Sequence, residues 1–235
     1  MNSFTFKQFV INQDQCAMKV GTDGVLLGSW CPIENAQNIL DIGTGTGLLA
    51  LMMAQRQPTA QIDAIEIDSN AAQQAKDNIA ASPWKNRIKV IKQSLQQFAN
   101  TTDNLYDLII CNPPYFINSL TPPNELRTLA RHCGTLTHSE LAKYASNLLT
   151  QNGHFVVIMP IEEGTSFLQI AKKSNLFCNH QLMIHPTPQS AAKRQIMVFS
   201  QIQKNQSIEH LTIEIARHQY TNEYRQLTKE FYLKF

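Results

Sequence analysis

The chain has 235 residues, of which 43% are hydrophobic and 16% charged, and its formal net charge is +2. This length and composition predict one globular domain over residues 1–235 and exclude a low-complexity or fibrous chain. The small net charge neither requires nor excludes a polyanionic partner, because local patches matter more than the total.

The cysteines and histidines give no sign of a disulfide framework or a metal site. The five cysteines are odd in number and lack C-x-x-C spacing, and the seven histidines include no H-x-x-x-H pair. The N-terminus has no charged segment followed by an apolar one, and no window is long enough to span a membrane. We therefore expect a cytoplasmic monomer that binds neither metal nor membrane.

The first 36 residues are expected to form an N-terminal extension. Aromatic residues within 4–10 predict a strand, residues 12–14 a turn, and residues 15–20 a return strand, which together make a small hairpin. Thr22 or Asp23 then suits the cap of a short helix, although a carboxylate beside glycines can also contact a ligand.

From residue 38 the pattern alternates between strand and helix. This alternation predicts a doubly wound, mostly parallel, seven-stranded sheet of the Rossmann-like α/β class over residues 37–205, with a C-terminal extension over 206–235. The expected strands are 38–42, 61–67, 88–92, 106–111, 154–159, 177–184 and 195–202. One helix is expected directly after Gly47, and three more over 70–81, 139–149 and 165–173.

A glycine-rich turn follows the first of these strands. Gly43, Gly45 and Gly47 alternate with other residues, a spacing that lets a ligand approach the backbone but differs from the G-x-G-x-x-G that cradles a pyrophosphate. Glu66 ends the second strand, where a carboxylate can accept both hydroxyls of a ribose. The pair points to a nucleoside cofactor; the alternative is a tight turn and a solvent-facing carboxylate.

A second polar corner follows the fourth strand. The apolar run 108–111 stops at Asn112-Pro113-Pro114-Tyr115-Phe116, and prolines cannot continue a central strand. Asn112 should therefore lie just past the carboxyl end of that strand, where open α/β sheets bind ligands. Two prolines stiffen the backbone that presents the Asn112 amide, the Pro113 carbonyl and the Tyr115 ring.

Together, residues 41–47, Glu66 and Asn112-Pro113-Pro114-Tyr115 resemble class I S-adenosylmethionine-dependent methyltransferases that methylate amino groups. Residues 18–28, 220–224 and 231–235 further resemble the bacterial tRNA1(Val) (adenine-N6)-methyltransferase family, and the resemblance runs essentially end to end. It implies methylation of the N6 amino group of an adenosine in tRNA, adenosine 37 beside the anticodon, with S-adenosylmethionine as the cofactor.

The resemblance also implies roles for individual residues. Asn112, Pro113 and Tyr115 would be catalytic, because two acceptors can hold an aromatic amine while a ring stacks on its base. Ser94 stands where many relatives carry an acidic contact to the cofactor's adenine, which leaves that contact open. The implied cofactor-binding set is Thr22, Asp23, Asp41, Gly43, Gly45, Gly47, Glu66, Ile67, Ser94 and Asn112.

Contacts to RNA are expected from aromatic and basic side chains around the pocket. Cations can line a phosphate track, although each of these residues can equally belong to a solvated face. Phe116 is as well suited to an ordinary core position as to a pocket wall. The substrate-binding candidates are Tyr115, Phe116, Arg127, Arg131, Lys193 and Arg194.

Three other functions use similar residues. Glutamine methylation in a protein such as a release factor shares the Asn-Pro-Pro-Tyr group, but its enzymes carry a helical N-terminal domain in place of the short hairpin expected here. Guanine N2-methylation of rRNA also fits a planar amine, and DNA adenine methylation lacks a segment long enough for target recognition. A non-catalytic RNA-binding protein predicts damage to the glycine turn or to Asn112, and both are intact.

Overall fold

The computed structural model describes residues 3–16, 18–113 and 136–234. Its centre is an eight-stranded sheet in which only β9 runs antiparallel to its neighbours, so the predicted mostly parallel α/β fold is confirmed. The strand order is β10 (Ser207–Thr212), β8 (Phe177–His185), β9 (Arg194–Ser200), β7 (Leu149–Pro160), β6 (Tyr106–Cys111), β3 (Asn38–Ile42), β4 (Gln61–Glu66) and β5 (Ile88–Lys92).

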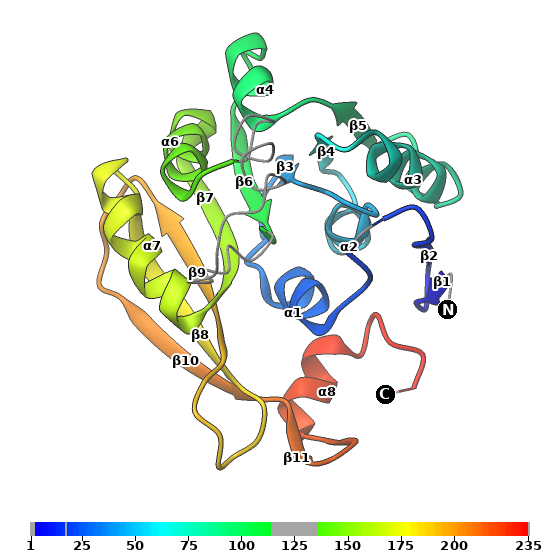
Figure 1. The fold of residues 1–235 in the computed structure, drawn as a ribbon, viewed down its shortest axis with the longest axis vertical. Coiled ribbons are helices and arrows are strands. Elements are labelled where there is room, and N and C mark those ends of the chain that lie inside the picture. The colour runs from blue at the N-terminus through cyan, green and yellow to red at the C-terminus, as the bar shows by residue number, and fades with distance from the viewer. Residues whose placement is uncertain (1–2, 17, 114–135, 235) are drawn as a thin grey trace, which may run out of the picture.

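Helices cover both faces of this sheet (Figure 1). One face packs against α1 (Thr22–Trp30), α2 (Leu48–Arg56), α3 (Ser69–Ala80) and α8 (Asn222–Thr228). The other packs against α4 (Leu95–Thr101), α6 (His138–Leu148) and α7 (Ile161–Lys173).

Strand β6 shows why the apolar runs become central strands. Its side chains alternate between the two cores: Leu108 and Ile110 face the α1 and α2 side, and Ile109 and Cys111 face the α6 and α7 side. A strand buried on both faces needs this continuous apolar run. The strand ends at Cys111, so Asn112 follows its carboxyl end, as predicted.

The N-terminal hairpin is confirmed, but its turn lies earlier than predicted. Strands β1 (Ser3–Thr5) and β2 (Val10–Asn12) pair antiparallel, and the Phe6 N–H donates to the Phe9 carbonyl at 2.9 Å. The expected turn at 12–14 and return strand over 15–20 are wrong. The turn lies between Phe6 and Phe9, because these two rings are buried and stack on each other with their centroids 4.6 Å apart.

Helix α1 begins where expected, but without the predicted side-chain cap. Its N-cap is Gly21, and no side chain accepts a cap hydrogen bond there. Thr22 and Asp23 lie inside the first turn. The Asp23 carboxylate accepts instead from Arg194 Nε of β9 at 2.9 Å, so a long-range ion pair takes the place of a local cap.

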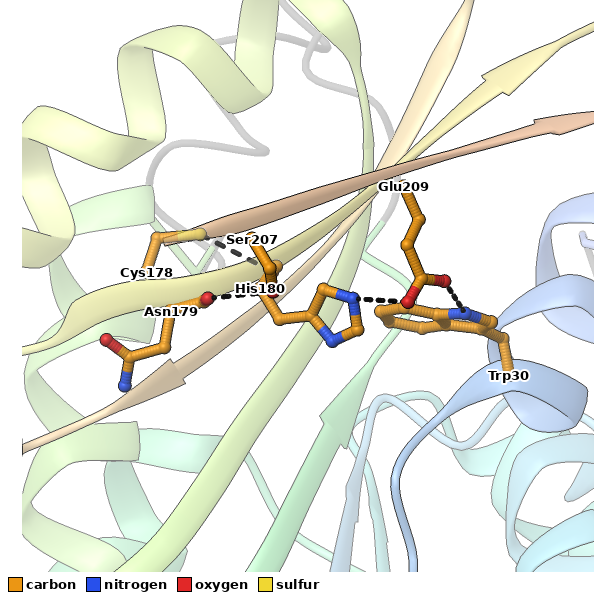
Figure 2. Close-up of polar contacts among 6 residues, drawn as sticks. All are labelled: Trp30, Cys178, Asn179, His180, Ser207 and Glu209. Carbon is orange, nitrogen blue, oxygen red and sulfur yellow. Dashed lines mark hydrogen bonds and ion pairs between the residues drawn. The ribbon is translucent and has the colours of Figure 1, made fainter. Parts of the chain in front are cut away.

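Strand β10 makes the sheet one strand wider than the seven predicted. It lies at the sheet's edge and is mostly exposed, so it lacks the apolar run that marks the central strands. Figure 2 shows how it is attached: Glu209 Oε1 lies 3.0 Å from His180 Nε2 of β8, and Trp30 Nε1 of α1 donates to Glu209 Oε2 at 3.4 Å. The division at residue 205 into core and extension stays a prediction.

The C-terminal segment returns to the N-terminal hairpin. After β10, strands β11 (Glu214–Ala216) and β12 (Gln219–Tyr220) pair antiparallel, and α8 follows. Tyr224 and Phe231 are buried, and the Phe231 carbonyl accepts from the Lys7 N–H at 2.9 Å. The first and last parts of the chain thus lie side by side (Figure 1).

In the described part of the chain, no helix is long and apolar enough to cross a membrane. The same residues contain no group of three or more histidine, cysteine or acidic side chains placed to hold a metal ion.

Candidate active site

A cavity of about 600 Å³ lies at the carboxyl edge of the sheet, where β3, β4, β5 and β6 end. This size falls within the range of small-molecule sites, about 300–1,000 Å³. The described residues that line it and were predicted from the sequence are Gly43, Gly45, Glu66, Ile67, Ser94, Asn112 and Pro113.

The three glycines of the turn serve two purposes. All have positive φ (70°, 56° and 85°), a conformation that favours glycine. A Cβ at Gly43 or Gly45 would meet nothing within 4 Å, so these two glycines border open space at the cavity. A Cβ at Gly47 would lie 3.5 Å from Ala75 and Ile79, so this glycine serves the packing of α2 against α3.

Asp41 supports the turn from below and does not line the cavity. The residue is fully buried; its Oδ2 accepts from Thr44 Oγ1 at 2.5 Å and from the Ala50 N–H of α2 at 3.1 Å. Burial raises the pKa of this carboxyl to about 7, opposed by those two hydrogen bonds and assisted by the charge of Glu66. Asp41 therefore fixes the turn to the first turn of α2.

Glu66 is held at the mouth of the turn by backbone groups. Its Oε2 accepts from the Gly45 N–H at 2.9 Å, and its Oε1 accepts from the N–H groups of Ile67 and Asp68 at 2.8 and 2.9 Å. A carboxylate offers about four lone-pair sites, so capacity remains for a ribose hydroxyl. The Ile67 side chain, 51% exposed, presents an apolar surface beside it.

The segment after the hairpin forms a wall that the sequence did not predict. Gln15, Cys16 and Met18 line the cavity, and Met18 is 48% exposed. Burial, followed by the charges of Glu66, Asp68 and Asp14, raises the pKa of Cys16 to about 11, so its thiol is protonated at neutral pH.

Two amides of α3 hold this wall in place. The Gln15 N–H donates to Gln74 Oε1 at 3.0 Å, and the Asn12 N–H donates to Asn78 Oδ1 at 2.9 Å. The Asn78 Nδ2 donates in turn to the carbonyls of Asn12 and Thr46, each at 2.9 Å. Asn78 thus joins the N-terminal segment to the glycine turn, a contact between residues so far apart in sequence that no local pattern signals it.

Ser94 lies in the cavity wall with its side chain already engaged. Its Oγ accepts from the Gln97 N–H at 3.2 Å, and its N–H donates to Gln97 Oε1 at 3.3 Å, which forms a capping box at the start of α4. Ser94 therefore begins α4 at the cavity wall, and its contact to the cofactor's adenine stays a prediction. Gln93 and Gln96 line the cavity on either side.

Asn112 brings an unsatisfied acceptor to the cavity. Its buried Oδ1 accepts no hydrogen bond from the described residues. The amide stands against α1, since a Cβ added at Gly24 would lie 3.8 Å from Asn112 Nδ2. A buried acceptor without a donor is costly unless a ligand supplies one. The site thus fits a ligand that donates hydrogens.

The remaining predicted residues lie elsewhere. Thr22, Asp23, Lys193 and Arg194 line a second cavity, which shares no described lining residue with the first. Tyr115, Phe116, Arg127 and Arg131 lie outside the described residues. Sequence reasoning missed further lining residues that follow strands or begin helices, namely Asp68, Asn70, Ala71, Leu136 and Leu141.

The comparisons with known proteins agree with this geometry. Residues 18–174 match the family described as "Methyltransferase small domain". A protein of Agrobacterium tumefaciens described as a predicted O-methyltransferase superposes with a TM-score of 0.69 at 20% identity, covering 89% of this chain and 96% of its own. A ribosomal protein L11 methylase of Lactobacillus delbrueckii subsp. bulgaricus superposes with a TM-score of 0.56 at 16% identity, covering 81% and 83%. These likenesses show the fold.

Much nearer relatives cover the chain from end to end. A tRNA1(Val) (adenine(37)-N6)-methyltransferase of Bacteroides fragilis is 50% identical over 232 residues, 98% of each chain. One of Trichodesmium erythraeum is 46% identical over 240 residues, covering 100% of this chain and 99% of its own.

The fold and the cavity define a methyltransferase that depends on S-adenosylmethionine. Its apolar walls, its glycine turn and the Glu66 carboxylate fit that cofactor. Within this class, the chain belongs to the tRNA1(Val) (adenine(37)-N6)-methyltransferase family.

Proposed function

We propose that this protein methylates the N6 amino group of adenosine 37 in tRNA1(Val), and does so in the cytoplasm. Full-length relatives named for this reaction support the substrate. The observation that carries the chemistry is the buried Oδ1 of Asn112, which accepts from no described residue and lies at the cavity that also contains the glycine turn and Glu66.

Asn112 and Pro113 would hold the substrate amine. The lone pair of an aromatic amine is delocalised into its ring, which makes the nitrogen a weak nucleophile. If Asn112 Oδ1 and the Pro113 carbonyl each accept one amine hydrogen, the nitrogen is oriented and shifted toward tetrahedral geometry. A neutral amide suffices, because the extra proton can leave after methyl transfer.

The cofactor would bind along the turn. Gly43 and Gly45 let its amino-acid end approach the backbone, Glu66 accepts from its ribose, and Ile67 packs against its adenine. Ser94 and its neighbours close the adenine end. When bound, S-adenosylmethionine supplies an electrophilic methyl group on a sulfonium.

Four residues would act by support. Asp41 and Gly47 fix the turn to α2 and α3, and Thr22 and Asp23 fix the start of α1 beside Asn112. We propose that Tyr115 and Phe116 face the flipped base, and that Arg127, Arg131, Lys193 and Arg194 contact phosphates.

The experiment uses the purified protein, labelled S-adenosylmethionine and bulk tRNA from cells that lack the protein. After digestion to nucleosides, the label is expected in N6-methyladenosine. Label in a protein fraction would favour glutamine methylation, and label in N2-methylguanosine would favour a guanine target. Either result, or no transfer, would contradict the proposed substrate.

A further inference from the structure

A second cavity, of about 920 Å³, lies between the N-terminal hairpin, the start of α1, the β8–β9 connection and the C-terminal segment. It contains no residue of the cofactor site described above. We call it the flanking groove and define it by three of its four rings and its three cations: Phe4, Tyr220, Tyr232, Lys193, Arg194 and Lys234.

The groove opens at the same edge of the sheet as Asn112. Because β9 is antiparallel, it begins at the edge where β6, β7 and β8 end, so Arg194 and Asn112 share that edge. Only β7 stands between β6 and β9 in the sheet. Strands lie about 4.8 Å apart, and Arg194 pairs with Pro160, which lies three residues beyond the partner of Cys111, so the groove begins about 14 Å from the end of β6.

Helix α1 connects the two places directly. Thr22 and Asp23 line the groove, while the next residue, Gly24, approaches the Asn112 amide. Successive helical residues advance by about 1.5 Å, so less than one turn of helix separates the groove wall from the catalytic amide. Successive nucleotides of a stacked strand lie about 3.4 Å apart, and unstacking of the target base lets the strand extend further, so a neighbour of the methylated nucleotide can reach the groove.

The side chains of the groove suit a nucleotide. Tyr220 stacks on the buried Tyr224 at 5.2 Å with the rings 25° apart, which restricts its motion, and Phe4 and Tyr232 lie 6.1 Å apart. Rings held in this way are platforms for bases, and Lys193 and Lys234 are exposed beside them. Among the described residues that line the groove, the carboxylates are Asp23, which is paired with Arg194, and Glu214, so three cations against two carboxylates leave one positive charge.

We propose that the flanking groove receives the single-stranded nucleotide next to the methylated adenosine of the tRNA, with its base on the rings and its phosphate at the lysines. This inference rests on the proposed function for the identity of the RNA. The groove holds the neighbour in place and so helps to keep the target base out of its stack.

The test combines protein variants with altered RNA. Wild type, Tyr220→Leu, Tyr220→Phe and Lys193→Ala are assayed with a tRNA1(Val) transcript, and Lys172→Ala on the exposed face of α7 is the matched lysine control. Two altered transcripts are also made, one with an abasic residue directly before adenosine 37 and one with an abasic residue directly after it. Binding of the tRNA, kcat/KM and the affinity for S-adenosylmethionine are measured.

Tyr220→Leu should raise the Kd for tRNA by about tenfold, the scale of one base stacked on a ring, with cofactor affinity unchanged. Tyr220→Phe keeps the ring and should match wild type. One of the two abasic transcripts should bind wild type about tenfold more weakly than the unaltered transcript does. The same transcript should bind Tyr220→Leu almost as tightly as the unaltered transcript does. Lys193→Ala should lower the slope of log K against log salt by about 1, and Lys172→Ala should not.

The groove inference is overturned if wild type and Tyr220→Leu respond equally to both abasic transcripts and the salt slope of Lys193→Ala is unchanged. If Tyr220→Leu does not fold, the loss of affinity of wild type for the abasic transcripts and the salt slope of Lys193→Ala decide. Ring-dependent tRNA binding without methylation would reject the proposed function and keep the groove. A wild type that binds no tRNA would reject both.

Discussion

At the scale of single residues, Asn112 and Asp41 are buried polar groups that differ in where they lie. Asn112 lines the cavity, and its Oδ1 accepts from none of the described residues, so a ligand in the cavity can satisfy it. Asp41 bonds one oxygen to Thr44 and Ala50, and its other oxygen likewise has no described donor, but the residue does not line the cavity. Asn112 is therefore assigned to the substrate and Asp41 to the support of the turn.

Asn112→Ala tests the first assignment. Loss of the acceptor should lower kcat by about 10²–10³-fold, the scale for removing one oriented partner in a transition state. Cofactor affinity, measured by calorimetry, should stay near the wild-type value because the turn and Glu66 are untouched. Asn38→Ala, an exposed amide at the opposite edge of the sheet, is the control. A collapse of cofactor binding in Asn112→Ala would refute this division of roles.

Asp41→Asn tests the second assignment, the support of the turn by Asp41, through the pH dependence of the free energy of unfolding. The pKa of Asp41 is about 7 in the fold against 3.8 ordinarily, so between these values the native state keeps a proton that the unfolded chain has lost. The free energy of unfolding should therefore fall as pH rises from about 4 to about 7, by up to roughly 4 kcal/mol relative to the variant. Urea unfolding at pH 4 and pH 8 measures this difference, and parallel pH profiles would contradict it.

At the scale of elements, the cofactor cavity depends on parts that lie far apart in the chain. The hairpin segment, the glycine turn and α3 meet at Asn78, whose amide is 1% exposed and bonded to Asn12 and Thr46. The wall formed by Gln15, Cys16 and Met18 follows from this junction.

Asn78→Ala should therefore weaken cofactor binding as well as stability. It leaves the Asn12 N–H and the Thr46 carbonyl without partners, so the free energy of unfolding should fall by about 1–3 kcal/mol. Calorimetry should show a raised Kd for S-adenosylmethionine. Gln73→Ala removes an exposed amide from the same helix and should change neither quantity. If the Kd were unchanged in folded Asn78→Ala, the wall would have no part in binding.

At the scale of the whole molecule, the central sheet could be predicted because its strands are buried on both faces. The apolar run Leu108–Cys111 is long enough for a buried strand and too short for a helix, and the polar residues after it mark its carboxyl end. Edge strand β10 was missed because exposed strands carry no such run, and α4 was missed although Ser94 and Gln97 form a readable capping box.

The site could be predicted only in part, for a physical reason. Gly43, Glu66 and Asn112 follow strands, so the topology of the sheet brings them together. The wall from Gln15 to Met18 and the pairing of Asp23 with Arg194 depend on contacts between distant segments, which periodicity does not encode.

The most direct measurement locates the methyl group in the product. The protein is incubated with S-adenosylmethionine and a tRNA1(Val) transcript, and ribonuclease fragments are sequenced by mass spectrometry. Transcripts with guanosine at position 37 and the Asn112→Ala protein serve as matched controls. We predict one methyl group, on adenosine 37, with wild type only. Methylation at another nucleotide, or an unchanged yield with Asn112→Ala, would contradict the account.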